Sequence, residues 1–348
     1  MSNTDKKKNK VQVAFAALNP YLEETSPLPI QKEVAGRDYV PYGRFNEYPH
    51  FLLDLYEHCS TLKAIIDGNV NFVCGDAITF DGLPASEELA DRVASLARDW
   101  YIFGYAFLRA IRNPFGEVIS DEYLQAEYVR TDKDRQSFWY SEKWNTRGSW
   151  KSVVWPAFLR EQNVPSSVLM LGSGRGIYPS PIWSAAIKDV MMEQKIEEFH
   201  LSELENNFTS SAIVNFCSGV PSDTEKADIE RNINEKFSGS ANAGRLLLSF
   251  SESVANRTTI DRLQSDSFDA RYQALSKRVR EMIYCSFKAQ PILFGLTSET
   301  NTGFSTNEFT DLFNLYNKVM ISPVQDMLKR AFRKVYGRDC LNITPFTI

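Results

Sequence analysis

The sequence predicts an α+β fold, because helical patterns precede and follow a block of strand patterns. Residues 48–72 carry apolar side chains at helical spacing, and residues 105–155 are rich in β-branched and aromatic residues separated by turn signals. Two long helical patterns, at 180–207 and 266–287, then flank a short insertion. The chain has 348 residues, 43% of them hydrophobic, which suggests about two structural units and a sizeable core.

Composition argues against several classes of protein. A net charge of −5 at pH 7 lacks the basic excess of a tight, non-specific nucleic-acid binder. No apolar run approaches the length of a membrane-spanning helix, and the start of the chain has no signal-peptide pattern. The cysteines are odd in number and scattered without CxxC spacing, which favours free thiols over a disulfide framework or a zinc site: Cys59, Cys74, Cys217, Cys285 and Cys340. We therefore expect a protein assembled in the cytosol, without membrane contact.

The first part of the chain predicts helices followed by a sheet. Pro49 marks the start of the first helix, and Gly75 ends it before the strand-like run "AITFDG". Residues 86–102 form a second amphipathic helix, and an antiparallel sheet follows. The "GSGRG" run at 172–176 predicts a loop. Before all of these, residues 1–40 predict a partly disordered arm that contains the basic run "DKKKNK".

The segment 180–207 predicts a helix roughly 40 Å long with an unusual surface. Its apolar stripe changes face, because the residues of the two ends and those of the middle fall on nearly opposite sides. The ends supply Ile182, Ala186, Val190, Leu201 and Leu204, and the middle supplies Met192, Ile196 and Phe199. The segment is also acidic, with two lysines against six carboxylates. Such a helix needs different neighbours along its length.

The insertion after this helix reads as strand, helix, strand. Apolar runs at 211–216 and 245–250 flank a charged helical pattern at 221–237. A unit of about 40 residues is too small to hold a core of its own. We therefore expect it to lean on something else.

The second long helix has the opposite charge bias. Its apolar stripe consists of Phe268, Tyr272, Leu275, Val279, Met282 and Ile283. Its basic residues lie off that stripe: Arg271, Lys277, Arg278 and Arg280. The acidic and basic helices are complementary, either within one molecule or between identical neighbours in a ring.

The last part of the chain predicts a polar loop and a final helix. Residues 288–306 begin with an apolar group around Pro291 and continue with little tendency to be buried, so we expect a mobile loop. Ser305 or Thr306 can cap the helix that follows, and Pro323 should kink it. The run "CLNITPFTI" predicts a closing strand.

Five stretches in this order are shared with a known family. They are "YPHFLLDLYEHCSTLKAIIDGNVNFVCGDAI", "WYIFGYAFLRAIRNPFGEVI", "GIYPSPIWSAAIKDVMMEQKIEEFHLSELENNFTSSAIVNF", "GSANAGRLLLSF" and "ISPVQDMLKRAF". Together they resemble the portal proteins of tailed bacteriophages, of the type shared by HK97-like and P2- or PBSX-like phages. The resemblance covers about residues 40 to 345. The "VPP" often found before the tunnel loop in that family stands here as "QPILFG", which leaves the geometry of the loop open.

The resemblance implies a portal fold. It has a mixed α/β wing, two long stem helices, a small strand-helix-strand clip and a final kinked wing helix. By position, the wing is 41–179 and 307–348, stem helix 1 is 180–207, the clip is 208–255, stem helix 2 is 256–287 and the tunnel loop is 288–306. The crown that often follows the last wing helix is expected to be short or absent.

The function that the resemblance implies is that of a homo-oligomeric ring, expected to be a dodecamer, at one capsid vertex of the virion. The ring is the channel for packaging and ejection of double-stranded DNA, which it contacts without sequence specificity. It is assembled in the host cytoplasm with the major capsid protein and scaffold. The clip docks the large terminase subunit during packaging and a head-completion adaptor afterwards. The resemblance implies neither catalysis nor a cofactor.

Three groups of residues are candidates for these roles. The tunnel loop is Thr297, Ser298, Glu299, Thr300, Asn301 and Thr302, for which simple disorder is the alternative. The basic face of the stem is Arg271, Lys277, Arg278, Arg280 and Lys288, which either contact DNA phosphates or form a solvated face or ion pairs with a neighbouring subunit. The docking surface of the clip is Glu225, Lys226, Asp228, Glu230 and Arg231, most of which are expected to be merely solvated.

Two other functions stay open. One is a different head-tail connector or neck ring protein, although such adaptors are usually shorter chains. The other is a cytosolic α+β enzyme, but "GSGRG" has no following Lys-Ser/Thr, and the three histidines show no metal-ligand spacing. His200 lies near Glu197 and Glu203, where a simple surface pair is the commoner explanation of i, i+3 spacing. We expect no metal site.

Overall fold

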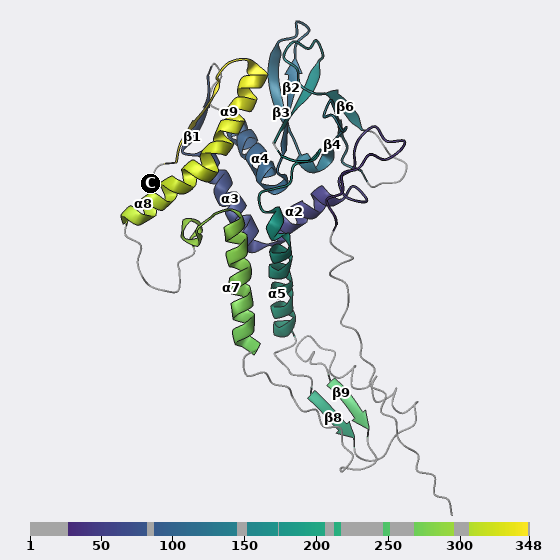
Figure 1. The fold of residues 1–348 in the computed structure, drawn as a ribbon, viewed down its shortest axis with the longest axis vertical. Coiled ribbons are helices and arrows are strands. Elements are labelled where there is room, and N and C mark those ends of the chain that lie inside the picture. The colour runs from purple at the N-terminus through teal and green to yellow at the C-terminus, as the bar shows by residue number, and fades with distance from the viewer. Residues whose placement is uncertain are drawn as a thin grey trace, which may run out of the picture.

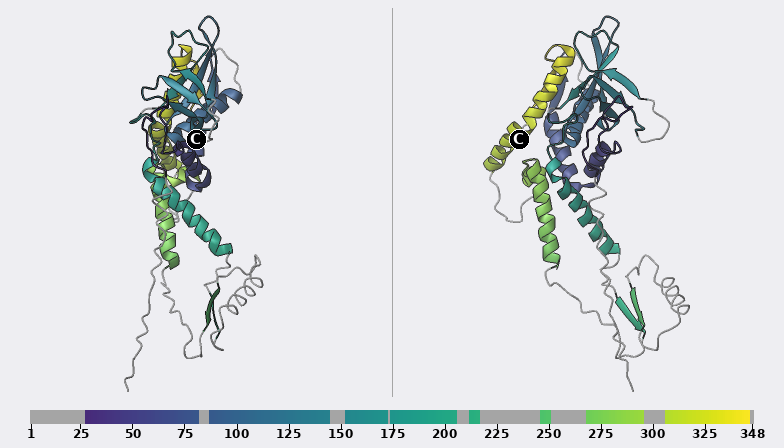
Figure 2. Two further views of the ribbon diagram at one scale, coloured as in Figure 1. Left: turned by 90° about the vertical axis from the view of Figure 1, so that its right-hand side faces the viewer. Right: turned by 45° about the vertical axis from the view of Figure 1, so that its right-hand side comes forward.

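The computed structural model describes residues 27–81, 87–144, 152–172, 174–205, 212–216, 246–250, 268–295 and 306–346. A mixed α/β body occupies one end of the molecule (Figure 1). Two helices, far apart in the sequence, leave this body at the same end, and two further views show that one is inclined to the other (Figure 2). The mixed fold class predicted from the sequence is therefore confirmed.

The first helical segment is two helices rather than one. The pattern at 48–72 predicted a single helix, but α2 (Tyr48–His58) and α3 (Ser60–Cys74) are separated by Cys59, whose backbone is extended at φ −107° and ψ 111°. The break lets both helices bury their apolar faces, because the chain changes direction at Cys59. Pro49 lies in the first turn of α2, as predicted.

Gly75 ends α3 and brings the chain into a two-stranded sheet. β1 (Ala77–Phe80) pairs antiparallel with β10 (Leu341–Thr344), so the closing strand predicted from the sequence lies beside the first strand of the body. Gly75 has φ +63°, and a Cβ there would overlap the carbonyl oxygen of Thr344. Only glycine therefore fits this junction without strain.

Helix α4 (Glu87–Phe103) is followed by two antiparallel three-stranded sheets with the orders β3-β2-β7 and β4-β5-β6. An isolated bridge between Ala157 and Val168 links the second sheet to the first. The short 3-10 turn η1 (Ala126–Tyr128) joins β3 to β4. The strands are β2 (Ala106–Arg112), β3 (Val118–Leu124), β4 (Val129–Thr131), β5 (Ser137–Tyr140), β6 (Val153–Pro156) and β7 (Ser166–Leu171).

Part of the segment predicted as an arm is fixed to this body. The Tyr178 hydroxyl donates to the carbonyl of Val40 at 2.6 Å and accepts from the backbone N–H of Thr131 at 2.9 Å. The Gln31 side chain donates to the carbonyl of Tyr178 at 2.7 Å and accepts from its N–H at 2.9 Å. Residues 31–42 therefore form part of the body, and residues 1–26 lie outside the described residues.

The acidic helix is shorter than predicted. Of the segment 180–207, residues 184–186 form the 3-10 turn η2 (Ser184–Ala186), and α5 runs over Ile187–Glu205. The first residues serve as an anchor instead, because Trp183 is fully buried and its indole N–H donates to the carbonyl of Tyr101 at 2.9 Å. The 19 residues of α5 span about 28 Å.

Helix α7 (Phe268–Ser286) returns toward the body antiparallel to α5 (Figure 1). Between them, β8 (Ala212–Phe216) and β9 (Leu246–Phe250) pair in parallel at the end of the molecule away from the body. Parallel neighbours need a crossover of a dozen or more residues, and residues 217–245 separate these strands. The helix predicted at 221–237 lies outside the described residues.

The final helix is interrupted. The apolar group around Pro291 is the 3-10 turn η4 (Pro291–Phe294), and α8 (Thr306–Tyr316) and α9 (Ser322–Tyr336) are joined by a π-helical turn at Asn317–Ile321. Pro323 lies in the first turn of α9 and has no N–H to donate, which accounts for the wider turn just before it. Figure 1 shows α8 and α9 as the two arms of a bent rod.

The Gly75 junction gives a stability test. We expect Gly75→Ala to lower the free energy of unfolding by about 3 kcal/mol, because the new Cβ meets the Thr344 carbonyl in a backbone conformation that alanine disfavours. Gly116→Ala is the matched control, since Gly116 has φ +86° with nothing within 4 Å of the added Cβ, and it should cost only about 1 kcal/mol. Urea unfolding followed by circular dichroism measures both. Equal losses in the two variants would contradict the close approach of β10 to this turn.

Candidate functional site

The two projecting helices pack through aromatic and aliphatic side chains. The rings of Phe199 on α5 and Tyr272 on α7 are stacked, with centroids 5.0 Å apart and an interplanar angle of 19°. Nearer the body, Val279 and Ile283 of α7 are buried. The imidazole of His200 meets the Tyr272 ring edge-on. We call α5 and α7 the helix pair.

The change of face predicted along α5 corresponds to different neighbours. Val190, near the body, is fully buried, whereas Ile196 and Phe199 further along lie on the side that faces α7. Leu201 belongs to the same predicted stripe as Val190 but lies beyond the body, and its side chain is 58% exposed. Among the described side chains of this stripe, Leu201 is therefore the exposed one beyond the body.

A buried carboxylate fixes α5 to the break between α2 and α3. Glu193 accepts a hydrogen bond of 2.6 Å from the Thr61 hydroxyl and one of 3.2 Å from the Cys59 thiol. The Ser60 hydroxyl donates to Glu197, one turn further along α5, at 3.1 Å. All three donors lie at the N-terminus of α3, where the helix dipole favours negative charge. Burial and the Glu193 carboxylate both raise the pKa of the Cys59 thiol, so this thiol stays protonated as a donor.

Helix α3 also contacts the chain on both sides of the predicted tunnel-loop residues 297–302. Before the segment, the Phe294 ring packs so closely on Gly68 that a Cβ there would lie 2.8 Å from it. After the segment, the Tyr316 hydroxyl donates to Asn69 at 2.7 Å, and the Gln325 amide donates to the carbonyl of Val73 at 3.0 Å. The chain therefore contacts α3 at Phe294 and contacts it again in the second half of α8, at Phe313 and Tyr316.

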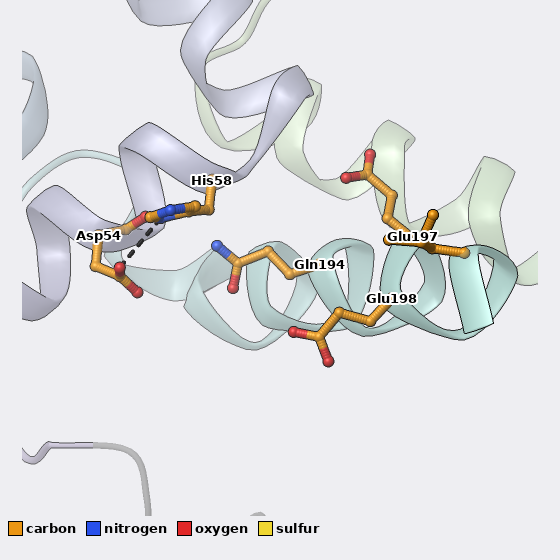
Figure 3. A pocket seen from close by; sticks show the side chains of 6 residues that line it. Asp54, His58, Gln194, Glu197 and Glu198 are labelled. Atoms are coloured by element: carbon orange, nitrogen blue, oxygen red, sulfur yellow. Dashed lines mark hydrogen bonds and ion pairs between the residues drawn. The ribbon is translucent and has the colours of Figure 1, made fainter. Parts of the chain in front are cut away.

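An acidic groove lies between α2 and α5 on the side of α5 away from α7 (Figure 3). It encloses about 560 Å³. Figure 3 shows the amide of Gln194 pointing between the helices toward His58, whose Nδ1 lies 3.1 Å from an Asp54 carboxylate oxygen. The lining residues are Asp54, His58, Gln194, Glu197, Glu198 and Leu201. Three carboxylates and an exposed leucine therefore share one surface.

The predicted basic face lies on α7 and just after it. Lys277, Arg278 and Lys288 are exposed, and Arg280 is engaged with Ser276 of its own helix, with one bond of 3.0 Å to the Ser276 hydroxyl. The side chain of Arg271 lies outside the described residues. Within the described side chains, no ion pair joins α5 to α7, so the intramolecular version of the predicted charge match has no support there.

Several other predicted residues are not described. The tunnel-loop residues Thr297 to Thr302 and the clip residues Glu225 to Arg231 lie outside the described ranges. Glu197 bonds Ser60, and the side chain of Glu203 is not described, so the possible ligand set around His200 gains no support. Across the part of the chain that the structure describes, no group of three or more His, Cys, Asp or Glu side chains could hold a metal ion. No helix among the described residues is both long and apolar enough to cross a bilayer.

Sequence reasoning missed the Glu193 contact and the groove. A signal for the first was present, because "CST" at 59–61 places hydroxyl residues of the kind that start helices inside an otherwise apolar pattern. The groove had no such signal, since Asp54 and Glu198 are far apart in the sequence and meet only through the packing of α2 on α5.

Solved structures share this fold. No family model and no curated protein matches the sequence. A chain from the neck of an empty gene transfer agent particle, computed with C6 symmetry, matches with a TM-score of 0.51 and 12% identity over 85% of this chain and 84% of that chain. A chain from the virion of a native gene transfer agent matches with a TM-score of 0.51 and 13% identity over 84% and 83%.

A third match is to an HK97-family phage portal protein from Corynebacterium diphtheriae. It has a TM-score of 0.50 and 11% identity over 84% of this chain and 95% of that chain. The resemblance drawn from the sequence is thus confirmed at the level of the fold. The chain has the fold of a phage portal protein.

A double-mutant cycle tests the contact between α5 and α3. We expect Thr61→Val and Glu193→Gln each to lower the free energy of unfolding by about 1 to 2 kcal/mol, because each weakens a charge-assisted hydrogen bond in a buried site. The double variant should lose about 1 kcal/mol less than the sum of the two. Glu161→Gln in an exposed turn is the control and should stay within about 0.5 kcal/mol of the parent. Strict additivity would contradict the contact.

Proposed function

We propose that this chain is the repeating subunit of a portal ring, the channel through which double-stranded DNA enters and leaves a virus-like particle. The observation that carries the proposal is the likeness to the HK97-family portal protein, which covers 84% of this chain and 95% of that chain. The helix pair projecting from an α/β body supports it, because a ring of such pairs would form a tube. In this reading the body is the wing, α5 and α7 are the stem, and residues 208–255 are the clip.

The ring is proposed to be a dodecamer at one vertex of the virion. The neck structure computed with C6 symmetry is compatible with six or twelve copies around its axis. The alternative is a neck ring of another kind, because one of the similar chains comes from the neck of a particle. The portal match favours the first reading.

Charge supports a conduit rather than a DNA clamp. Each phosphate contact releases counterions and adds affinity, so a channel through which DNA slides should attract it weakly. The net charge of −5 and the acidic helix α5 agree with this. We assign Thr297 to Thr302 to the polar constriction, because this polar stretch lies between two parts of the chain, Phe294 and Tyr316, that both contact α3.

Partners follow from the same proposal. The clip residues Glu225, Lys226, Asp228, Glu230 and Arg231 would dock the large terminase subunit and then a head-completion adaptor. The major capsid protein and scaffold would surround the wing during assembly. These contacts involve binding and not turnover, so we propose no enzymatic role and no cofactor.

Assembly state tests the proposed function. We expect mass photometry of the purified full chain to show a closed oligomer of about twelve subunits, and negative-stain images to show a ring with a hole wide enough for a duplex. Adding scaffold protein is the control for a portal that needs help to assemble. A chain that stays monomeric with and without scaffold, at every concentration tested, would contradict the proposal.

Replacing residues 297–302 with a Gly-Ser linker of equal length tests the constriction. We expect rings to form as in the parent, because the anchors at Phe294 and Tyr316 are untouched. Particles assembled with the variant should hold less DNase-protected DNA. As the control, Gly-Ser replaces the two residues 133–134 of an exposed turn, and this variant should have the DNA content of the parent. Loss of the ring in the 297–302 variant would show that the segment is structural.

A further inference from the structure

The charged surfaces of the helix pair lie on different sides of it, and Arg278 lies beside the packed stripe of α7 rather than opposite it. On α5, Gln194, Glu198 and Leu201 lie on the side opposite Ile196, which faces α7. On α7, Lys277 lies on the side opposite Val279, which is buried toward the pair. In Figure 1, α7 lies beside α5, and α2, which forms the other wall of the groove, lies across the body end of α5.

Both surfaces combine charge with an apolar centre. Leu201 lies three residues after Glu198 and so on the same face of α5, within the acidic groove. On α7, Leu275 and Met282 lie three residues before and four residues after Arg278, and they are 37% and 38% exposed. Each surface thus has apolar side chains beside its charges, and the charges of the two surfaces have opposite signs. This is the pattern of two complementary sides of a protein interface.

These surfaces have no counterpart among the residues that the structure describes. Neither Lys277 nor Arg278 has a hydrogen-bond or ion-pair partner among the described residues. Of the groove carboxylates, Glu197 accepts from Ser60 of α3, whereas Asp54 and Glu198 are engaged only locally, with His58 and with Lys195 at 2.6 Å. Leu201, Lys277 and Arg278 are therefore available for contact with another molecule.

We infer that the acidic groove of one copy receives the basic face of α7 from the next copy of the same chain. This inference rests on the proposed ring and names its contact. Because the groove and the basic face are two different surfaces of the chain, the contact is heterologous, which generates a closed ring when the rotation per subunit closes. The occupant of the groove is Arg278 with Lys277 beside it, seated against Leu201, and not DNA.

Complementary charge reversals test the contact. The first variant reverses the groove with Asp54→Lys and Glu198→Lys, two residues outside the Glu193 contact. The second reverses the helix with Lys277→Glu and Arg278→Glu. Each variant alone sets like charges against each other at every interface, so the protein concentration needed for half-maximal assembly should rise by about tenfold or more. Circular dichroism and the unfolding midpoint check that each monomer is folded.

An equimolar mixture of the two variants gives the decisive result. Every groove can then meet an α7 of opposite charge if the variants alternate, so rings should return with equal numbers of each variant, countable by native mass spectrometry. Lys133→Glu with Asp134→Lys, in an exposed turn, is the control and should assemble like the parent.

The outcomes separate this inference from the proposed function. Parent rings with no effect of either reversal would overturn the contact and leave the portal proposal standing. Rings that persist in the second variant with altered DNA passage would place Lys277 and Arg278 in the channel instead. A parent chain that never forms rings would overturn both.

Discussion

The arrangement of the molecule depends on the contact between Glu193 of α5 and the start of α3. A carboxylate buried at a helix N-terminus is stable only when donors surround it, and here Thr61 and Cys59 supply them. The contact fixes the direction in which α5 leaves the body, because it holds the first half of the helix at one point. The direction of α5 in turn sets the position of the groove and the packing of α5 on α7.

Helix α3 combines several such roles. It receives α5 at its first turn and Phe294 against Gly68 in its middle. The next residue, Asn69, accepts a hydrogen bond from Tyr316 at the end of α8. The loop proposed to touch DNA and the helix proposed to line the stem are thus attached to one element.

The sequence predicted the elements with strong periodicity and failed where tertiary contacts override it. The spacing of apolar residues located α4 and α7, and Gly75 and Pro323 marked real changes in the chain path. It did not predict the break at Cys59, because the apolar pattern continues through that residue and the reason for the break lies on α5. The sequence pattern also placed the start of the acidic helix at residue 180, because no local signal shows that Trp183 is buried in the core. The groove could not be predicted from the sequence, because the residues of its two walls are far apart along the chain.

The central claim is that α5 and α7 of neighbouring copies form the wall of a channel. Cryo-electron microscopy of the assembled protein, at a resolution that separates helices, tests it most directly. The account predicts a tube of paired helices around the axis, with α7 of each copy against the α2–α5 groove of the next. The α/β bodies should lie outside it, and the segment between Gly295 and Thr306 should point into the channel. A ring in which the helix pairs point outward, or in which neighbouring pairs do not touch, would contradict it.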